Sequence, residues 1–422
     1  MSENIYAEII TIGDEILYGQ ITNTNSRFIS AELDSAGFRT IRQTSVGDSE
    51  SEILKSLAEA ETRAQVIVLT GGLGPTRDDI TKNTLAKYFN SEMVVNTSAQ
   101  EELRTFLEYR GRTLSGLNQF QAVLPKACRH MSNRIGTAPG MWFDKGDKVI
   151  LSMPGVPAEM KEMLTMQALP RLKERYHTPT IYHKIIRTAG IPETFLAEKI
   201  EDWENALPEH IRLAYLPSFG GVKLRLTATG PDINVLKAET EELTKQLRPL
   251  AGDYIFAEED TELEKVVATM LENNRQMLSV AESCTGGSLA ALLTAMPGSS
   301  EWFSGAAVTY SVESKIKVLG INADTIAKHT VYSLEVAAEM AQNVRALYGT
   351  DFGLATTGVA GPPRPEDVVP AGTIFIAVAH ADGVETKQLK LGTEREINIK
   401  MTNLNVMNML RHKLLAEDRE KK

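Results

Sequence analysis

Ser283 stands in a stretch whose residue types suit nucleophilic chemistry. An apolar run over residues 277–281 is followed by Glu282-Ser283-Cys284-Thr285-Gly286-Gly287, and a helical pattern opens at Ser288. This order predicts a strand, a tight turn and a helix. The turn would lift a hydroxyl above the sheet, beside helix N-terminal N–H groups that favour negative charge. Ser283 is therefore a candidate nucleophile beside an anion hole, and an N-cap of the helix is the alternative.

A second group of candidate residues follows three predicted strands in the N-terminal third. These strands lie at residues 5–12, 38–46 and 66–70, and the carboxylates that follow them are Asp14, Asp48, Asp78 and Asp79. The glycine run Gly71-Gly72-Leu73-Gly74 lies between the third strand and its acidic pair. Glycine backbone can present several N–H groups to phosphate oxygens. Carboxylates hold hard divalent cations, which often bridge to substrate phosphates.

This pattern predicts a phosphate site with a metal ion. Gly71, Gly72 and Gly74 would form the cradle, and the four aspartates are the candidate metal ligands. The alternative is that Asp78 and Asp79 cap a helix that begins near Ile80, while the glycines only make the turn. The P-loop sequence Gly-x-x-x-x-Gly-Lys-[Ser/Thr] is absent from the chain.

Strands that alternate with helices must position both groups. Such alternation predicts parallel sheets with helices on both faces, and ligands then sit at the carboxyl ends of the strands. The predicted fold class is α/β, with two parallel-sheet α/β domains joined by a small α+β module. We place these parts at residues 1–169, 170–256 and 257–416. The middle part has no clear catalytic cluster, so we interpret it as a spacer or a dimerisation unit.

The bulk properties exclude several classes of protein. The chain has 422 residues, a formal net charge of -10 and no long Lys/Arg cluster, so we expect no nucleic-acid partner. Its first residues do not form a signal peptide, and no apolar run approaches the roughly 20 residues that span a bilayer. Its two cysteines allow no disulfide framework. A cytoplasmic protein without membrane attachment is expected.

Several motifs in one order resemble the CinA family (competence/damage-inducible protein CinA) over nearly the whole chain. They are residues 13–20 with Asn23-Thr24-Asn25, residues 70–79, Met153-Pro154-Gly155-Val156-Pro157, residues 281–287, Tyr310-Ser311 with Lys315, and Thr357-Gly358-Val359-Ala360-Gly361-Pro362. The first domain looks like the MoaB/MogA molybdopterin-binding fold, the middle part like a KH-like module, and the last domain like a PncC-type nicotinamide mononucleotide amidohydrolase.

The resemblance implies a bifunctional enzyme of pyridine nucleotide salvage. Its last domain would hydrolyse nicotinamide mononucleotide to nicotinic acid mononucleotide and ammonia without a cofactor. Its first domain would split ADP-ribose into AMP and ribose 5-phosphate with a divalent metal (Mg, Mn or Co). The family also suggests a homodimer. The alternative is a non-catalytic nucleotide- or pterin-binding protein that acts in competence or the DNA damage response through partners.

The resemblance also implies roles for single residues. Lys315 would be the base and Tyr310 a helper in proton transfer or orientation. Backbone N–H groups of Thr285, Gly286 and Gly287 would hold the oxyanion, and Thr357 and Gly358 belong to the expected substrate-binding set. For Lys315 to act at neutral pH, burial or nearby positive charge must lower its pKa; the alternative is a surface lysine. Cys284 is the rival nucleophile, or a small packed side chain.

The chain departs from the family after Gly361. It continues with Pro362-Pro363-Arg364-Pro365, where the family commonly has more glycines. Proline fixes φ and removes an N–H donor, so this loop would bind a phosphate differently. Arg364 is a candidate phosphate ligand in compensation, and a solvated side chain is the alternative.

Overall fold

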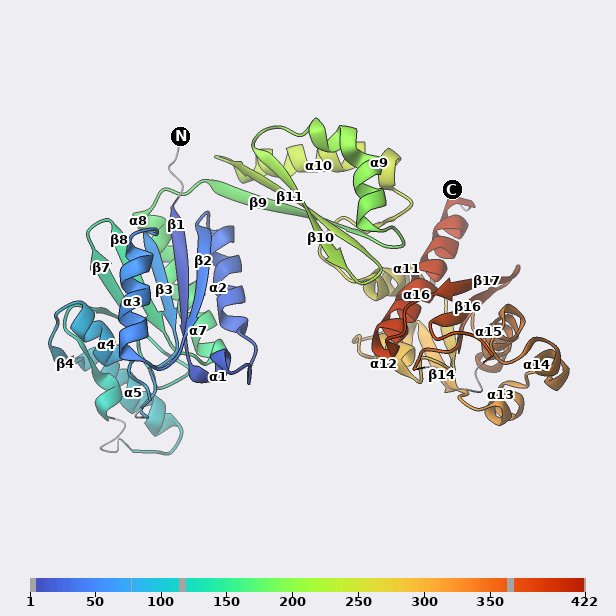
Figure 1. The fold of residues 1–422 in the computed structure, drawn as a ribbon, viewed down its shortest axis with the longest axis horizontal. Helices are drawn as coiled ribbons and strands as arrows, with labels where there is room; N and C mark the ends of the chain where they lie inside the picture. The colour runs from blue at the N-terminus through green and yellow to red at the C-terminus, as the bar shows by residue number, and fades with distance from the viewer. Residues whose placement is uncertain (1–4, 77, 114–118, 363–367, 421–422) are drawn as a thin grey trace. The chain divides into compact units, whose positions relative to one another are not determined.

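The computed structural model describes residues 5–76, 78–113, 119–362 and 368–420 (Figure 1). Contacts between Cα atoms divide the chain into two units. The first contains Met1–Tyr182 and Ala228–Leu236, and the second contains His183–Thr227 and Lys237–Lys422. Most of the middle part therefore groups with the C-terminal domain. The predicted boundaries at residues 169 and 256 stay predictions.

A six-stranded sheet with the order β2-β1-β3-β8-β7-β6 forms the centre of the first unit. The strands of this unit are β1 (Tyr6–Ile12), β2 (Arg39–Val46), β3 (Val66–Thr70), β4 (Met93–Val95), β5 (Val123–Pro125), β6 (Arg129–Met131), β7 (Gly140–Lys145) and β8 (Lys148–Met153). Its helices are α1 (Asp14–Leu17), α2 (Thr24–Ser35), α3 (Glu50–Glu61), α4 (Thr81–Tyr88), α5 (Thr97–Tyr109), η1 (Phe120–Ala122), α7 (Pro157–Met163), η2 (Leu164–Ala168) and α8 (Leu169–Arg175).

Alternating side chains of the buried strands separate two hydrophobic cores in this unit. Ile9 and Val68 pack with α2, α7 and α8 on one face, while Ile10 and Leu69 pack with α3, α4 and α5 on the other. Strands β2, β1, β3 and β8 run parallel, and β7 and β6 are antiparallel additions at one edge. The carboxyl ends of the parallel strands therefore meet at one edge of the sheet.

The small α+β module belongs mostly to the second unit. The strands there are β9 (Thr180–Thr188), β10 (Ile211–Ser218), β11 (Gly221–Gly230) and β12 (Ile255–Ala257), in the sheet order β10-β11-β9-β12. The helices are α9 (Glu193–Asn205) and α10 (Ile233–Ala251). Within the unit, the Arg411 guanidinium is buried and donates to the carbonyl oxygens of Asp253 and Ile255, at 3.0 and 3.1 Å.

The C-terminal domain has a five-stranded sheet with the order β14-β13-β15-β16-β17. Its strands are β13 (Leu278–Glu282), β14 (Phe303–Val308), β15 (Phe352–Gly358), β16 (Thr373–His380) and β17 (Gly383–Lys390). Its helices are α11 (Leu263–Asn274), α12 (Ser288–Thr294), η3 (Ser299–Glu301), α13 (Val312–Leu319), α14 (Ala323–His329), α15 (Leu334–Tyr348) and α16 (Arg395–Glu420). Strands β14, β13 and β15 are parallel to one another. Strand β16 is antiparallel to β15, and β17 is antiparallel to β16.

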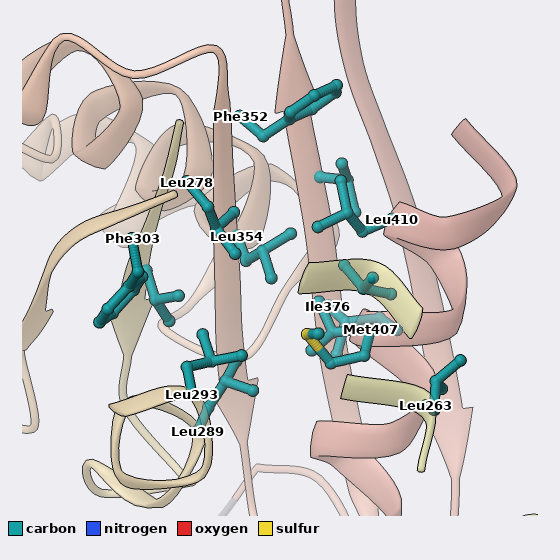
Figure 2. Packing of buried hydrophobic residues seen from close by; sticks show 14 of the residues in the cluster. Leu263, Leu278, Leu289, Leu293, Phe303, Phe352, Leu354, Ile376, Met407 and Leu410 are labelled. Atoms are coloured by element: carbon teal, nitrogen blue, oxygen red, sulfur yellow. The ribbon is translucent and has the colours of Figure 1, made fainter. Parts of the chain in front are cut away.

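Helices cover both faces of this sheet as well. Figure 2 shows the larger core, in which Leu278 and Leu354 of the sheet meet Leu289 of α12 and Leu410 of α16. On the opposite face, alanines of β13, β14 and β15 pack against α13 and α15. The domain thus fixes the three parallel strand ends between two packed layers.

The structure confirms the α/β class and corrects its details. The parallel strands and their helices are present in both domains, but each sheet also has antiparallel strands. The sequence predicts the hairpin of β16 and β17, and it does not predict the antiparallel strands β6 and β7. The sequence analysis missed strands β4, β5, β6, β7, β10 and β12. In the described part of the chain, no helix is long and apolar enough to cross a membrane.

Candidate functional site

Ser283 follows directly after β13, at the carboxyl end of the parallel strands. Its backbone N–H donates to the carbonyl oxygen of Thr356 in β15 at 2.9 Å, which ties the start of the turn to the sheet. Residues 283–287 form the turn, and α12 begins at Ser288 with Gly287 as its N-cap. Ser283 is therefore not the N-cap of this helix, and the alternative reading of this serine is wrong.

Lys315 lies in the first turns of α13, after β14, and points into the domain. A capping box between Ser311 and Ser314 fixes the start of this helix. The Lys315 side chain is 2% exposed. Its Nζ donates to Ser283 Oγ at 2.8 Å and to the carbonyl oxygen of Thr309 at 2.8 Å. Lys315 is not a surface lysine.

Burial gives this lysine the property that a base needs. Removal from water disfavours the ammonium form and lowers the pKa of Lys315 to about 8. A substantial fraction of the amine is then neutral in mildly alkaline solution. The neutral amine can take the proton of the Ser283 hydroxyl, which is already within hydrogen-bonding distance.

Cys284 is poorly suited to be the nucleophile. Its side chain is buried in the larger core of the domain, and burial raises the pKa of its thiol to about 12. The thiolate, which is the reactive form, is therefore scarce. Packing is the better explanation of this residue.

A cavity of about 330 Å³ opens in front of the Ser283–Lys315 pair. Tyr310 and Arg395 contribute the aromatic ring and the positive charge of its wall. Arg395 Nη2 donates to the Tyr310 hydroxyl at 3.1 Å, and Nη1 donates to the Gly361 carbonyl oxygen at 3.0 Å. The cavity is lined by Ser283, Cys284, Tyr310, Ser311, Val312, Lys315, Val331, Tyr332, Gly358, Val359, Ala360, Gly361, Pro362 and Arg395.

Arg395 was missed by sequence reasoning. It stands at the start of α16, far along the chain from every motif, and no local pattern marks it. The nearby Asn398 is buried in the same helix and donates to the Ala360 carbonyl oxygen at 2.8 Å. Together these two side chains tie the loop after β15 to α16, so the cavity wall is built from two distant segments.

The structure changes the expected set of oxyanion and substrate-binding residues. Gly287 donates its N–H to the Glu282 carboxylate, and Gly286 donates to the Ser283 carbonyl oxygen, so neither group is available as predicted. The Thr285 hydroxyl bonds to the Thr356 hydroxyl, and the Thr357 hydroxyl donates to the Val331 carbonyl oxygen. Both residues are buried, and neither is among the residues that line the cavity. The role predicted for the Thr285 backbone N–H stays a prediction.

Two further predictions concern the loop after β15. Gly358 lines the cavity, as a substrate-binding residue must. Arg364 lies outside the described residues, so its prediction stays as it was.

The glycine run of the first unit lines a larger cavity, of about 450 Å³, at the carboxyl ends of β1, β3 and β8. Gly71 has a positive φ of 114°, and a Cβ there would clash with the Ile12 carbonyl oxygen. A Cβ at Gly74 would clash with the Asp79 carboxylate. Only glycine permits this close approach of loop and strand.

Asp79 shapes the loop. Its Oδ1 accepts the Gly74 N–H at 2.7 Å, and its Oδ2 accepts the Thr76 N–H at 2.9 Å and the Thr76 hydroxyl. The N-cap of α4 is Ile80, without a side-chain capping bond. The alternative in which Asp78 and Asp79 cap this helix is therefore wrong.

The four aspartates do not form one cluster. Asp48, Asp78 and Asp79 line the cavity, whereas Asp14 does not; it exchanges bonds with Asp48 through backbone N–H groups, at 3.2 and 3.4 Å. Within the described ranges, no three His, Cys, Asp or Glu side chains are arranged to hold a metal ion by themselves.

A divalent cation held partly by phosphate oxygens still fits this edge. Burial raises the pKa of Asp48, and the charges of Asp14, Glu15 and Asp78 raise the same pKa further. Mg²⁺ commonly takes only one or two carboxylates together with substrate phosphates. Of the four predicted aspartates, Asp48 and Asp78 would be available to such an ion, because Asp14 does not line the cavity and Asp79 is engaged by the loop. Glu15 and Glu159 also line this cavity.

Comparison with profiles of known families agrees with this architecture. Three family profiles match the chain: a probable molybdopterin binding domain over residues 8–174, a damage-inducible protein CinA KH domain over residues 183–257, and a CinA C-terminal domain over residues 260–414. A solved structure of the protein CinA with unknown function from Thermoplasma acidophilum is 32% identical. That match covers 41% of this chain and 98% of that one, with a TM-score of 0.37.

Relatives of similar length match nearly the whole chain. A CinA-like protein of Cytophaga hutchinsonii is 46% identical, with 98% of this chain and 99% of the relative covered. A putative competence-damage inducible protein of Thermoanaerobacter pseudethanolicus is 37% identical, with 97% and 98% covered. The chain belongs to the CinA family.

Proposed function

We propose that the C-terminal domain is an amidohydrolase that converts nicotinamide mononucleotide to nicotinic acid mononucleotide and ammonia. The observation that carries this proposal is the hydrogen bond from buried Lys315 Nζ to Ser283 Oγ. Amide hydrolysis needs a nucleophile and a base that takes its proton, and these two side chains meet both needs without a histidine.

The reaction would proceed through an acyl-enzyme. Ser283 Oγ attacks the carboxamide carbon, while neutral Lys315 accepts the hydroxyl proton and becomes an ammonium. The ammonium then returns the proton to the leaving nitrogen, and ammonia departs. Water enters with Lys315 again as base, and the ester to Ser283 is cleaved to release the carboxylate.

The cavity wall supports a nucleotide as the substrate. The Arg395 guanidinium lines the cavity on the same side as the Tyr310 hydroxyl, and it is exposed enough to meet a ligand. Guanidinium is a strong partner for phosphate oxygens. A ring amide over Ser283 and a phosphate at Arg395 would be held at the same time.

For the N-terminal domain we propose hydrolysis of ADP-ribose to AMP and ribose 5-phosphate. The support is a cavity lined by a glycine loop and by Asp48 and Asp78. A bound divalent cation would neutralise diphosphate charge and lower the pKa of a water molecule. The glycine loop would bind the phosphates, and Asp48 would orient the cation.

Nucleotide or pterin binding without turnover is the second candidate for this domain. Among the residues that the structure describes, no three His, Cys, Asp or Glu side chains are arranged to hold a metal ion, and this favours the second candidate. The two candidates differ in whether AMP appears when ADP-ribose and Mg²⁺, Mn²⁺ or Co²⁺ are supplied.

Ser283→Ala removes the proposed nucleophile, so ammonia release from nicotinamide mononucleotide should fall at least about 10³-fold. AMP release from ADP-ribose should not change. Cys284→Ala is the matched control and should keep ammonia release close to that of the unmodified protein. Ammonia and AMP are assayed separately. If Ser283→Ala still releases ammonia, Ser283 is not the nucleophile. If only Cys284→Ala loses ammonia release, Cys284 is the nucleophile instead.

Because only the neutral amine of Lys315 accepts a proton, kcat/KM for ammonia release should rise with pH through about 8 and level off above it. In the variant Lys315→Arg, the guanidinium that replaces the amine stays protonated. This variant should therefore lose activity at every pH tested. The measurement is a pH–rate profile of both proteins. A flat profile, or an active Lys315→Arg variant, contradicts the role of the lysine as base.

Asp48→Asn should lower metal-dependent AMP release by about 10–100-fold, because one oxygen ligand with its charge is lost. Ammonia release by the other domain should remain, and thermal melting checks that the first unit of the variant is folded. Initial rates are compared at several Mg²⁺ and Mn²⁺ concentrations. AMP release that keeps its rate and its metal dependence would remove Asp48 from the site.

A further inference from the structure

Glu282, the residue before Ser283, uses its carboxylate inside the domain. The side chain is fully buried. Its Oε2 accepts the N–H groups of Gly287 and Leu289 at 2.9 and 3.1 Å, and its Oε1 accepts the Ala290 N–H at 2.7 Å. These are N-terminal groups of α12 that have no partner within the helix.

The turn that carries Ser283 is therefore fixed at both ends. At one end, Glu282 lies in the sheet between Val308 of β14 and Thr356 of β15. At the other end, the Glu282 side chain holds the first turn of α12. The Gly286 N–H donates to the Ser283 carbonyl oxygen at 3.1 Å, which closes the turn between these two points.

The Glu282 carboxylate also occupies the position at the start of α12 where an anion would bind. The positive end of the helix attracts an anion, and the anion there is the chain's own carboxylate. A substrate oxyanion cannot use the Gly287 N–H while Glu282 accepts from it. The acidic residue of the motif thus serves the geometry of the turn.

We propose that Glu282 is a positioning residue of the amidohydrolase, which holds the Ser283 turn so that the hydroxyl meets Lys315. This inference rests on the proposed function of the domain. Without the carboxylate, the turn and the first turn of α12 lose the connection between them. Ser283 Oγ is then no longer held at 2.8 Å from Lys315 Nζ.

The test compares Glu282→Gln, Glu282→Asp and the control Glu313→Gln in the full chain. Glu282→Gln keeps the shape but loses the charge and one acceptor, and Glu282→Asp keeps the charge on a shorter side chain. Glu313 is exposed on α13 and bonds only to Lys317 among the residues described, so it controls for removal of a carboxylate near Lys315.

We expect kcat for ammonia release to fall about 10–100-fold in Glu282→Gln, with KM changed less than about threefold, because a small displacement of the nucleophile slows the chemical step. Glu282→Asp should retain more activity than Glu282→Gln. Glu313→Gln should release ammonia at the rate of the unmodified protein. AMP release should be unaffected in all three variants. Thermal melting identifies the folded variants, and a purely structural role would lower Tm without changing kcat of the folded protein.

A crystal structure of Glu282→Gln gives a readout that needs no activity. The proposal expects the Ser283–Lys315 hydrogen bond to be lost or lengthened. An unchanged bond together with an unchanged kcat overturns the positioning role while the amidohydrolase stands. If the unmodified protein releases no ammonia, the proposed function fails, and the crystal structure alone then decides whether Glu282 positions Ser283.

Discussion

The burial of the Lys315 amine is the constraint on which the C-terminal site depends. An ammonium without water must be compensated by hydrogen bonds or lose its proton. Here it has two acceptors, Ser283 Oγ and the Thr309 carbonyl oxygen. The end of β13 supplies one of them and the end of β14 the other, while the capping box of α13 fixes the lysine. Three elements of the fold therefore converge on one nitrogen atom.

Both domains use an acidic side chain to hold a glycine turn at the end of a parallel strand. In the first unit Asp79 accepts the Gly74 N–H, and in the second Glu282 accepts the Gly287 N–H. In each case the carboxylate satisfies backbone donors that would otherwise be unpaired. An acid beside a glycine run can thus serve the loop itself, and only its partners distinguish this from ligand binding.

Local patterns predicted the parallel strands and the turn at Ser283, because both depend on residues close together in the chain. The pairing of Lys315 with Ser283 came from the family resemblance. Sequence spacing could not show whether that lysine points inward, since the packing of α13 decides it. Arg395 was missed because its partners, Gly361 and Tyr310, lie far away in the chain. The partners of Glu282 lie close to it in the chain, but the bonds depend on the geometry of the turn, which residue types alone do not show. Gly287 was assigned to the oxyanion because the residue pattern does not show that Glu282 accepts its N–H group.

If Lys315 activates Ser283 as the nucleophile, covalent trapping tests this role most directly. The protein is treated with a sulfonyl fluoride and digested, and the modified peptide is identified by mass spectrometry. We expect an adduct on Ser283 that forms much more slowly in Lys315→Met. An adduct on Cys284, or equal labelling of Ser283 with and without the lysine, would contradict it.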